Sequence, residues 1–204
     1  MRHGAPPFQN RGYTEWLMER QTSRWIAPGL TAAAALVRLA PHPWNFTPVE
    51  SMGLYGGARL ASWQAWVLPL AAMAVTDPIA SRMLGYPAFS SMTVIVYACL
   101  LINVFLGRTI VGRKNSAVRI GSASLLGSTV FFLVTNFFVW LGTPLVTYPR
   151  TLGGLEECFA AAIPFFGWTL LGNLFYAGVM FGLDAVLRRH AAVEDGTTAV
   201  SAVR

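Results

Sequence analysis

The sequence predicts an all-α, polytopic membrane protein of six transmembrane helices with both termini in the cytoplasm. Of its 204 residues, 54% are hydrophobic and only 12% are charged, with a mean hydropathy of +0.50. A soluble domain of this composition would expose large apolar patches to water. When the apolar stretches are threaded through a bilayer, 12 of the 15 basic residues fall on one side: Arg2, Arg11, Arg20, Arg24, Arg59, Arg108, Arg113, Lys114, Arg119, Arg188, Arg189 and Arg204. Basic residues are retained in cytoplasmic loops, so this charge bias predicts that both termini are cytoplasmic. A chain whose two ends lie on the same side crosses the membrane an even number of times.

The chain is expected to hold a single membrane domain, residues 25–189, between two cytoplasmic tails. Residues 1–24 are polar and Arg-bearing and lack the apolar core of a signal peptide. Residues 190–204 are expected to form a short disordered end. The pI is about 9.9. In a membrane protein the basic residues that raise it orient the spans and contact anionic lipid headgroups, so we expect no nucleic-acid partner.

The first span, residues 25–40, is rich in small side chains. Gly29 and Ala33 are four residues apart, and Ala34 continues the run. Small residues at this spacing let a second helix approach closely. The face formed by Gly29, Ala33 and Ala34 is therefore either an internal packing surface or a docking face for a partner subunit.

The second span, residues 47–60, follows a connection that contains Pro41, Pro43 and Pro48, which interrupts the helix. It carries Glu50 and three glycines in an apolar context. Because a carboxylate facing lipid is costly, this helix is expected to be surrounded by the others, with Glu50 facing inward.

The remaining spans are expected at residues 63–80, 91–106, 118–141 and 165–187. Helices of this length suit a bilayer core of roughly 30 Å. A long outer segment, residues 142–164, is expected to connect the fifth and sixth spans.

Costly polar residues gather in the outer half of this topology. Asp77 ends the third span, Asn136 lies toward the outer end of the fifth, and the outer loops add Trp44, Asn45 and Tyr148. A pocket of aromatic walls with a few polar groups suits a small ligand. We predict Trp44 and Tyr148 as walls of such a site, with Asn45, Asp77 and Asn136 as polar anchors.

A structural interpretation competes with this pocket. Asp77 could pair with Arg82 or Arg38, and the asparagines could hydrogen-bond neighbouring helices. Asn173 in the last span is expected to bridge helices. Aromatic residues of the fifth span are expected to face lipid or the core; they are Phe131, Phe132, Phe137, Phe138 and Trp140.

The chain carries no recognisable enzyme, zinc or nucleotide motif. It has no Gly-x-Ser-x-Gly elbow, no His-Glu-x-x-His and no phosphate-binding loop. The two cysteines lack metal-ligand spacing. We therefore expect no catalytic residues, no cofactor and no metal site. One question stays open, namely whether His42 or Cys158, both in the outer part of the protein, binds a metal ion or the cobalt of a corrin.

Several segments resemble a family of small uncharacterised bacterial membrane proteins, over about residues 25–187. The resemblance rests on Val37-Arg38-Leu39, the Pro-rich run 41–48, Asp77, the aromatic run 131–140, Tyr148-Pro149-Arg150-Thr151 and Ile163-Pro164-Phe165-Phe166. That family looks related to the substrate-binding S-components of energy-coupling factor (ECF) vitamin transporters. The resemblance implies an S-component-like bundle with an outer ligand pocket and a first helix that docks a transmembrane coupling subunit served by ATPases.

The sequence-based hypothesis is thus a multi-pass inner-membrane subunit that captures a small water-soluble, vitamin-like nutrient. The alternative is a structural or assembly subunit of a larger membrane complex, in which the small-residue faces bind protein. A membrane enzyme acting on lipid is a third class, for which we find no nucleophile and base.

Overall fold

The computed structural model describes residues 11–85, 87–113, 116–142, 144 and 146–201. In these residues the regular structure is helical. The elements are α1 (Arg11–Val37), α2 (Val49–Arg59), α3 (Gln64–Leu84), α4 (Ser91–Leu106), a short π-helix η2 (Gly107–Val111), α5 (Ala117–Gly142) and α6 (Leu152–Ser201). The expected all-α class is confirmed.

Four helical segments are long and apolar enough to cross a membrane: α3, α4 continued by η2, α5, and the Leu152–Ala191 part of α6. The apolar part of α1, Arg24–Val37, is shorter. Large apolar side chains on these helices point outward, among them Leu36, Val75 and Phe105. A surface of this kind is matched to lipid and not to water, so the fold has the character of a helical membrane protein.

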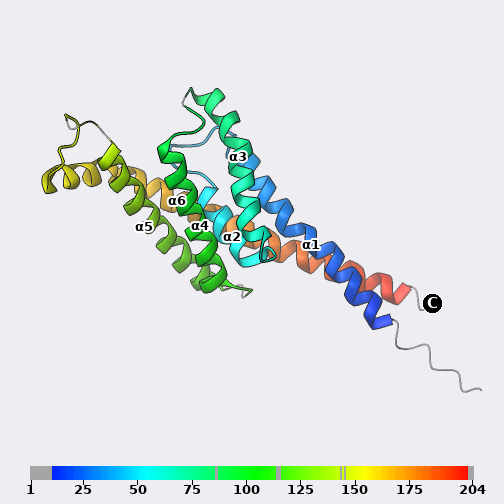
Figure 1. The fold of residues 1–204 in the computed structure, drawn as a ribbon. Coiled ribbons are helices and arrows are strands. Elements are labelled where there is room, and N and C mark those ends of the chain that lie inside the picture. Colours follow the sequence, from blue (N-terminus) through cyan, green and yellow to red (C-terminus); the bar gives the residue numbers. More distant parts are fainter. Residues whose placement is uncertain (1–10, 86, 114–115, 143, 145, 202–204) are drawn as a thin grey trace, which may run out of the picture.

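Helix α2 lies at the centre of the bundle (Figure 1), where it contacts α1, α3, α4, α5 and α6. Every residue from Val49 to Ala58 is buried, so the expectation of a surrounded helix is confirmed. Glycines allow the close packing: a Cβ on Gly57 would clash with the Val104 carbonyl, and one on Gly107 with the Leu54 carbonyl. With 11 residues, α2 is about 16 Å long at 1.5 Å per residue and does not cross a bilayer core by itself.

The two ends of the bundle differ in what they carry. At one end, called here the 38–48 end, lies the connection between α1 and α2. At the other, the Arg59 end, Arg59 donates a hydrogen bond to the Gly112 carbonyl at 2.6 Å and Arg108 donates one to Ser62 at 2.9 Å. The beginning of α1 and the end of α6 lie at one extremity of the molecule (Figure 1), so the described ends of the chain share a side.

Three helix boundaries differ from the sequence prediction. Helix α1 begins at Arg11, because the segment expected to be a polar tail contains many good helix formers and no proline after residue 7 before Pro28. Helix α6 begins at Leu152 and not at Phe165, because the Thr151 hydroxyl accepts a bond from the Gly154 N–H and caps it.

The same helix continues to Ser201, so the end expected to be disordered is helical through that residue. No proline stops it after Pro164, and Pro164 itself is accommodated inside the helix. Membrane helices tolerate such an interruption where neighbours satisfy the freed backbone groups.

Candidate functional site

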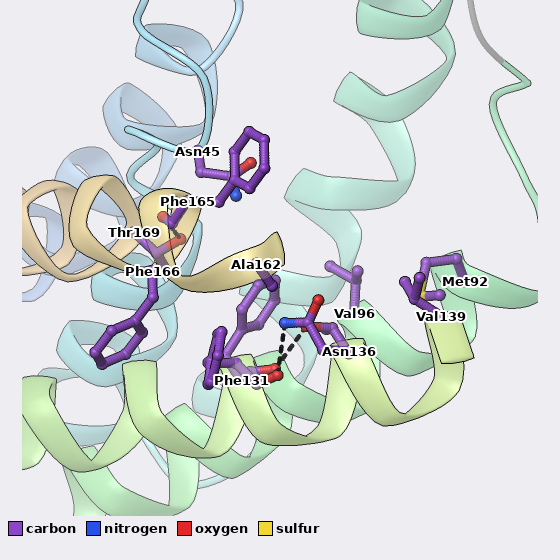
Figure 2. A pocket seen from close by; sticks show the side chains of 12 residues that line it. Asn45, Met92, Val96, Phe131, Asn136, Val139, Ala162, Phe165, Phe166 and Thr169 are labelled. Carbon is purple, nitrogen blue, oxygen red and sulfur yellow. Dashed lines mark hydrogen bonds between the residues drawn. The ribbon is translucent and has the colours of Figure 1, made fainter. Parts of the chain in front are cut away.

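A cavity of about 240 Å³, called the outer cavity, lies between the 38–48 connection and helices α4, α5 and α6. Figure 2 shows side chains from all four segments around it. Its lining is Asn45, Met92, Val96, Phe131, Phe132, Thr135, Asn136, Val139, Ala162, Phe165, Phe166 and Thr169. The lining combines phenylalanine rings and aliphatic side chains with a few polar groups, as in many small-molecule sites.

A second cavity of about 140 Å³, called the inner cavity, adjoins the first. It is lined by Arg38, Asn45, Thr47, Val49, Glu50, Met73, Val96, Phe131 and Thr169. Four of these residues, Asn45, Val96, Phe131 and Thr169, also line the outer cavity. The two spaces therefore form a path from the 38–48 end toward Glu50 on the central helix.

The polar groups of the outer cavity are mainly acceptors. Thr135, Asn136 and Thr169 each donate to a backbone carbonyl four residues earlier, at 2.7, 2.8 and 3.0 Å respectively. The bonds of Thr135 and Asn136 are drawn in Figure 2. A hydroxyl that already donates its proton can still accept hydrogen bonds through its lone pairs, and the free oxygen of an amide can accept them too. The site therefore suits a ligand that brings hydrogen-bond donors.

Asn45 is held at the junction of both cavities by its neighbour. Its φ of 61° lies in the left-handed region, which asparagine tolerates better than most residues. Phe46 anchors the connection on α6, with ring centroids 5.6 Å from Phe175 and 5.4 Å from Tyr176. A Cβ on Gly172 would come within 3.0 Å of the Phe46 Cα, so this glycine permits the close approach.

Arg38 belongs to an ion-pair network at the edge of the inner cavity. Its Nη1 lies 2.6 Å from Asp77 Oδ1 and donates to Thr76 at 2.7 Å. The Tyr97 hydroxyl donates to the other Asp77 oxygen at 2.7 Å. Both oxygens of Asp77 are thus engaged, and the network ties α1, α3 and α4 together.

Glu50 lies in a second polar cluster, formed mainly by α2, α5 and α6. Its Oε2 accepts hydrogen bonds from Ser128 at 2.5 Å and from Asn173 at 2.8 Å. The Asn173 amide also bonds the Ser128 hydroxyl at 3.0 Å and the Ser124 carbonyl at 3.1 Å. Glu50 faces inward as predicted, with 4% of its surface exposed, and Asn173 bridges helices as predicted.

The structure brings some of the predicted anchors together and separates others. Asn45 and Asn136 both line the outer cavity. Asp77 lies behind Arg38, in the pairing that the structural interpretation anticipated. Trp44 is 80% exposed on the 38–48 connection and lies outside the lining of either cavity.

Tyr148 also lies outside both linings, in the connection between α5 and α6. Its carbonyl accepts a bond from Arg150, whose guanidinium lies 5.5 Å from the Trp140 ring. Trp44 and Tyr148 thus line neither of these two cavities, and their role as walls of a ligand site stays a prediction.

The aromatic residues that line the outer cavity were not predicted as pocket residues from the sequence. Phe131 and Phe132 were expected to face lipid or core. Phe165 and Phe166 entered only through the family resemblance, without a role in a site, and Thr169 was not named. A signal was present, because Phe131 and Phe132 precede Thr135 and Asn136 by four residues and so share their helix face. Only the packing of α5 against α6 shows that this face is concave.

The small-residue face of α1 divides between two environments. Gly29 and Ala33 are exposed, and a Cβ on Gly29 would meet nothing within 4 Å. Ala34 is 6% exposed and packs into the hydrophobic core. Ala34 is therefore removed from the docking face, since α1 turns it toward its own bundle.

Two residues left open as metal ligands lie apart in the fold. Both ring nitrogens of His42 lie near carbonyl oxygens, of Pro43 at 3.0 Å and Arg38 at 3.1 Å. Cys158 is buried on α6, with its sulfur 3.6 Å from the Asn136 carbonyl. Among the residues that the structure describes, three or more His, Cys, Asp or Glu side chains nowhere gather as a metal site would require.

The helices that form both cavities fall within one family match. Residues 18–195 match the model described as a family of unknown function, DUF6580. The chain belongs to the DUF6580 family. No curated protein matches it, and no solved structure does. The description of DUF6580 assigns no activity, so function has to be argued from the geometry above.

Proposed function

We propose that this chain is a multi-pass inner-membrane subunit that binds a small water-soluble nutrient for uptake. In this proposal the six helices lie N-in and C-in, with the 38–48 end facing outward. The basic residues near the Arg59 end, such as Arg108, Arg113 and Arg119, support that orientation. The S-component-like role and the coupling subunit with its ATPases rest on the sequence resemblance.

The observation that carries the proposal is the pair of adjoining cavities at the 38–48 end. Together they lie near the lower end of the roughly 300–1,000 Å³ range of small-molecule sites. Four phenylalanines line the outer cavity. Oxygen acceptors from Thr135, Asn136 and Thr169 are fixed by bonds to their own helices. A compact ligand with a flat apolar body and hydroxyl or amine donors fits this lining.

A cavity-filling substitution tests nutrient binding. Ala162 is buried and lines the outer cavity, whereas its neighbour Ala161 is exposed on the same helix. We expect A162L to remove a vitamin-sized adduct seen by native mass spectrometry of the purified protein, because leucine occupies the ligand's space. A161L is the matched control and should keep the adduct, because its side chain points away from the bundle.

The same measurement on the wild-type protein sets the baseline. If the wild type carries no adduct and binds none from a mixture of water-soluble vitamins, the nutrient proposal fails. Loss of an adduct in both leucine variants would assign the effect to the helix and not to the cavity.

The orientation is tested separately by cysteine accessibility. In a background lacking Cys99 and Cys158, a cysteine replacing exposed Thr151 should react with an impermeant thiol reagent added to intact cells. A cysteine replacing Ser116, which precedes α5 at the Arg59 end, should be protected. Reversed labelling would place the cavities on the cytoplasmic side and overturn uptake from outside.

A structural or assembly subunit is the second proposal, and the exposed Gly29 and Ala33 on α1 favour it. A groove of small residues lets a partner helix come to backbone contact, where van der Waals packing supplies the attraction in lipid. In that case a partner helix, and not a nutrient, would be the functional ligand of the chain.

A further inference from the structure

Four buried oxygen atoms in the Glu50 cluster have no hydrogen-bond partner among the described residues. They are Glu50 Oε1, Asn103 Oδ1, Ser124 Oγ and Asn173 Oδ1, and they come from α2, α4, α5 and α6 in that order. All four residues are at least 96% buried. Unpaired buried polar atoms are rare in folded proteins, and a group of them calls for an explanation such as a bound ion or water.

Contacts between these residues place them in one region of the bundle. Asn173 bonds both Glu50 and the Ser124 carbonyl. Asn103 reaches the same region, because a Cβ on Gly127, between Ser124 and Ser128 on α5, would run into its Oδ1. A Cβ on Gly53, one turn after Glu50, would lie 3.1 Å from the Asn103 Cβ.

Reversing the two amides does not remove the free oxygens. The Asn173 nitrogen already faces three acceptors: Glu50 Oε2, the Ser128 hydroxyl and the Ser124 carbonyl. Its oxygen in that place would meet the carboxylate and the carbonyl, acceptor against acceptor. The Asn103 nitrogen likewise bonds the Cys99 carbonyl at 3.1 Å. Three of the four free atoms are therefore acceptors only, and the fourth, the Ser124 hydroxyl, can both accept and donate.

The charge of Glu50 is also uncompensated. Among the described residues, the ion pairs are formed by Asp77 with Arg38 and by Asp184 with Arg59 and Arg188, and Glu50 has none. Buried charges in membrane helices are normally paired or mark an ion pathway. One negative charge with neutral oxygens calls for a single positive charge.

We propose that the Glu50 cluster binds one Na⁺ ion. Hard cations prefer carboxylate, amide and hydroxyl oxygens, which is the set of free atoms present. A monovalent ion neutralises Glu50, whereas a divalent ion leaves an excess positive charge. A proton on Glu50 makes one O–H donor, which pairs Glu50 Oε1 with at most one other oxygen and leaves at least two of the four unpaired.

The inner cavity supplies an access route. Glu50 lines it, and it joins the outer cavity through Asn45, Val96, Phe131 and Thr169. Arg38 on the same wall is paired with Asp77, so its charge is already balanced. The site lies beyond the proposed nutrient cavity, and the Na⁺ proposal does not depend on nutrient binding.

Purified protein without added nutrient provides the test. We expect one ²²Na⁺ bound per chain, and a higher melting temperature in NaCl than in choline chloride at the same ionic strength, because an ion that binds the folded state stabilises it. KCl should give a clearly smaller shift. No Na⁺ binding, or an equal response to KCl, would overturn the assignment.

Two variants and a matched control locate the ion. E50Q should abolish ²²Na⁺ binding, since it keeps the shape and removes the charge. S124A should weaken binding about tenfold or more, the effect of losing one interaction with a charged group. S122A, the same change at an exposed position of α5, should leave binding unchanged. Full binding in S124A, or a loss in S122A equal to that in S124A, would contradict the site even if E50Q did not fold.

Discussion

Two buried carboxylates join the central helix α2 to α6, and their surroundings are opposite. Asp184 on α6 accepts from Tyr55 at 2.9 Å and Arg188 at 2.8 Å on one oxygen, and from Arg59 at 2.9 Å on the other. Glu50 on α2 accepts from two neutral side chains on one oxygen, and its other oxygen is unpartnered among the described residues.

The contrast separates a structural tie from an available site. Both oxygens of Asp184 accept hydrogen bonds and the carboxylate is paired with two arginines, as expected of a structural tie. Glu50 has a free oxygen and no cationic partner among the described residues. Removing Asp184 should therefore damage the fold, whereas neutralising Glu50 should affect binding.

The largest effect is expected from D184N. It leaves Arg59, whose side chain is 6% exposed, without its carboxylate. Losing one partner of a buried ion pair typically costs about 3 to 5 kcal/mol. We expect unfolding of the purified variant in detergent at a much lower denaturant concentration than the wild type.

E50Q is the matched comparison for that experiment, because it makes the same acid-to-amide change on the partner helix. In choline chloride it should unfold close to the wild type, since no ion pair is broken. Equal destabilisation by D184N and E50Q would abolish the distinction between the two carboxylates.

An intermediate effect is expected from D77N. The Arg38–Asp77 pair, with side-chain exposures of 11% and 10%, is more accessible than the Arg59–Asp184 pair, with 6% and 0%. Hydrogen bonds to charged groups contribute about 1.5 to 3 kcal/mol, so the loss of stability should be smaller than in D184N. The same unfolding measurement ranks the two variants.

D77N also sharpens the interpretation of Asp77 as a ligand anchor. If it removed a nutrient adduct while unfolding like the wild type, Asp77 would be an anchor as predicted from the sequence. If it lost stability and kept the adduct, its role would be to hold Arg38.

The smallest effect compares two adjacent alanines on α1. Ala34 packs in the core, so A34L should overpack it and cost about 1 to 3 kcal/mol. Ala33 is exposed, so A33L should leave unfolding unchanged and weaken co-purification with a partner subunit. Destabilisation by A33L equal to that by A34L would show that both faces of α1 pack internally.

The sequence predicted the general architecture better than the helix ends. A buried α2 with an inward Glu50 followed from a carboxylate and three glycines in an apolar segment, because lipid excludes the charge and glycine permits close contact. The starts of α1 and α6 were missed, since polar residues and Pro164 suggested interruptions. Capping by Thr151 and good helix formers outweighed those local signals.

The candidate site was predicted in part. Asn45 and Asn136 line the outer cavity, whereas Trp44 and Tyr148 do not. Polar residues at one depth of a bundle can be grouped by counting along each helix. Which of them face one another depends on helix rotation, and composition does not specify rotation.

The sequence by itself determined that the chain is helical and has membrane character, because hydropathy and helix length act locally along the chain. Tertiary structure alone decided that residues 50, 103, 124 and 173 direct unpaired oxygens toward one buried region. These residues are on four helices, and no local spacing rule connects them. Their juxtaposition depends on the glycine contacts of α2 with α4 and of α5 with Asn103, which only the packed bundle brings together.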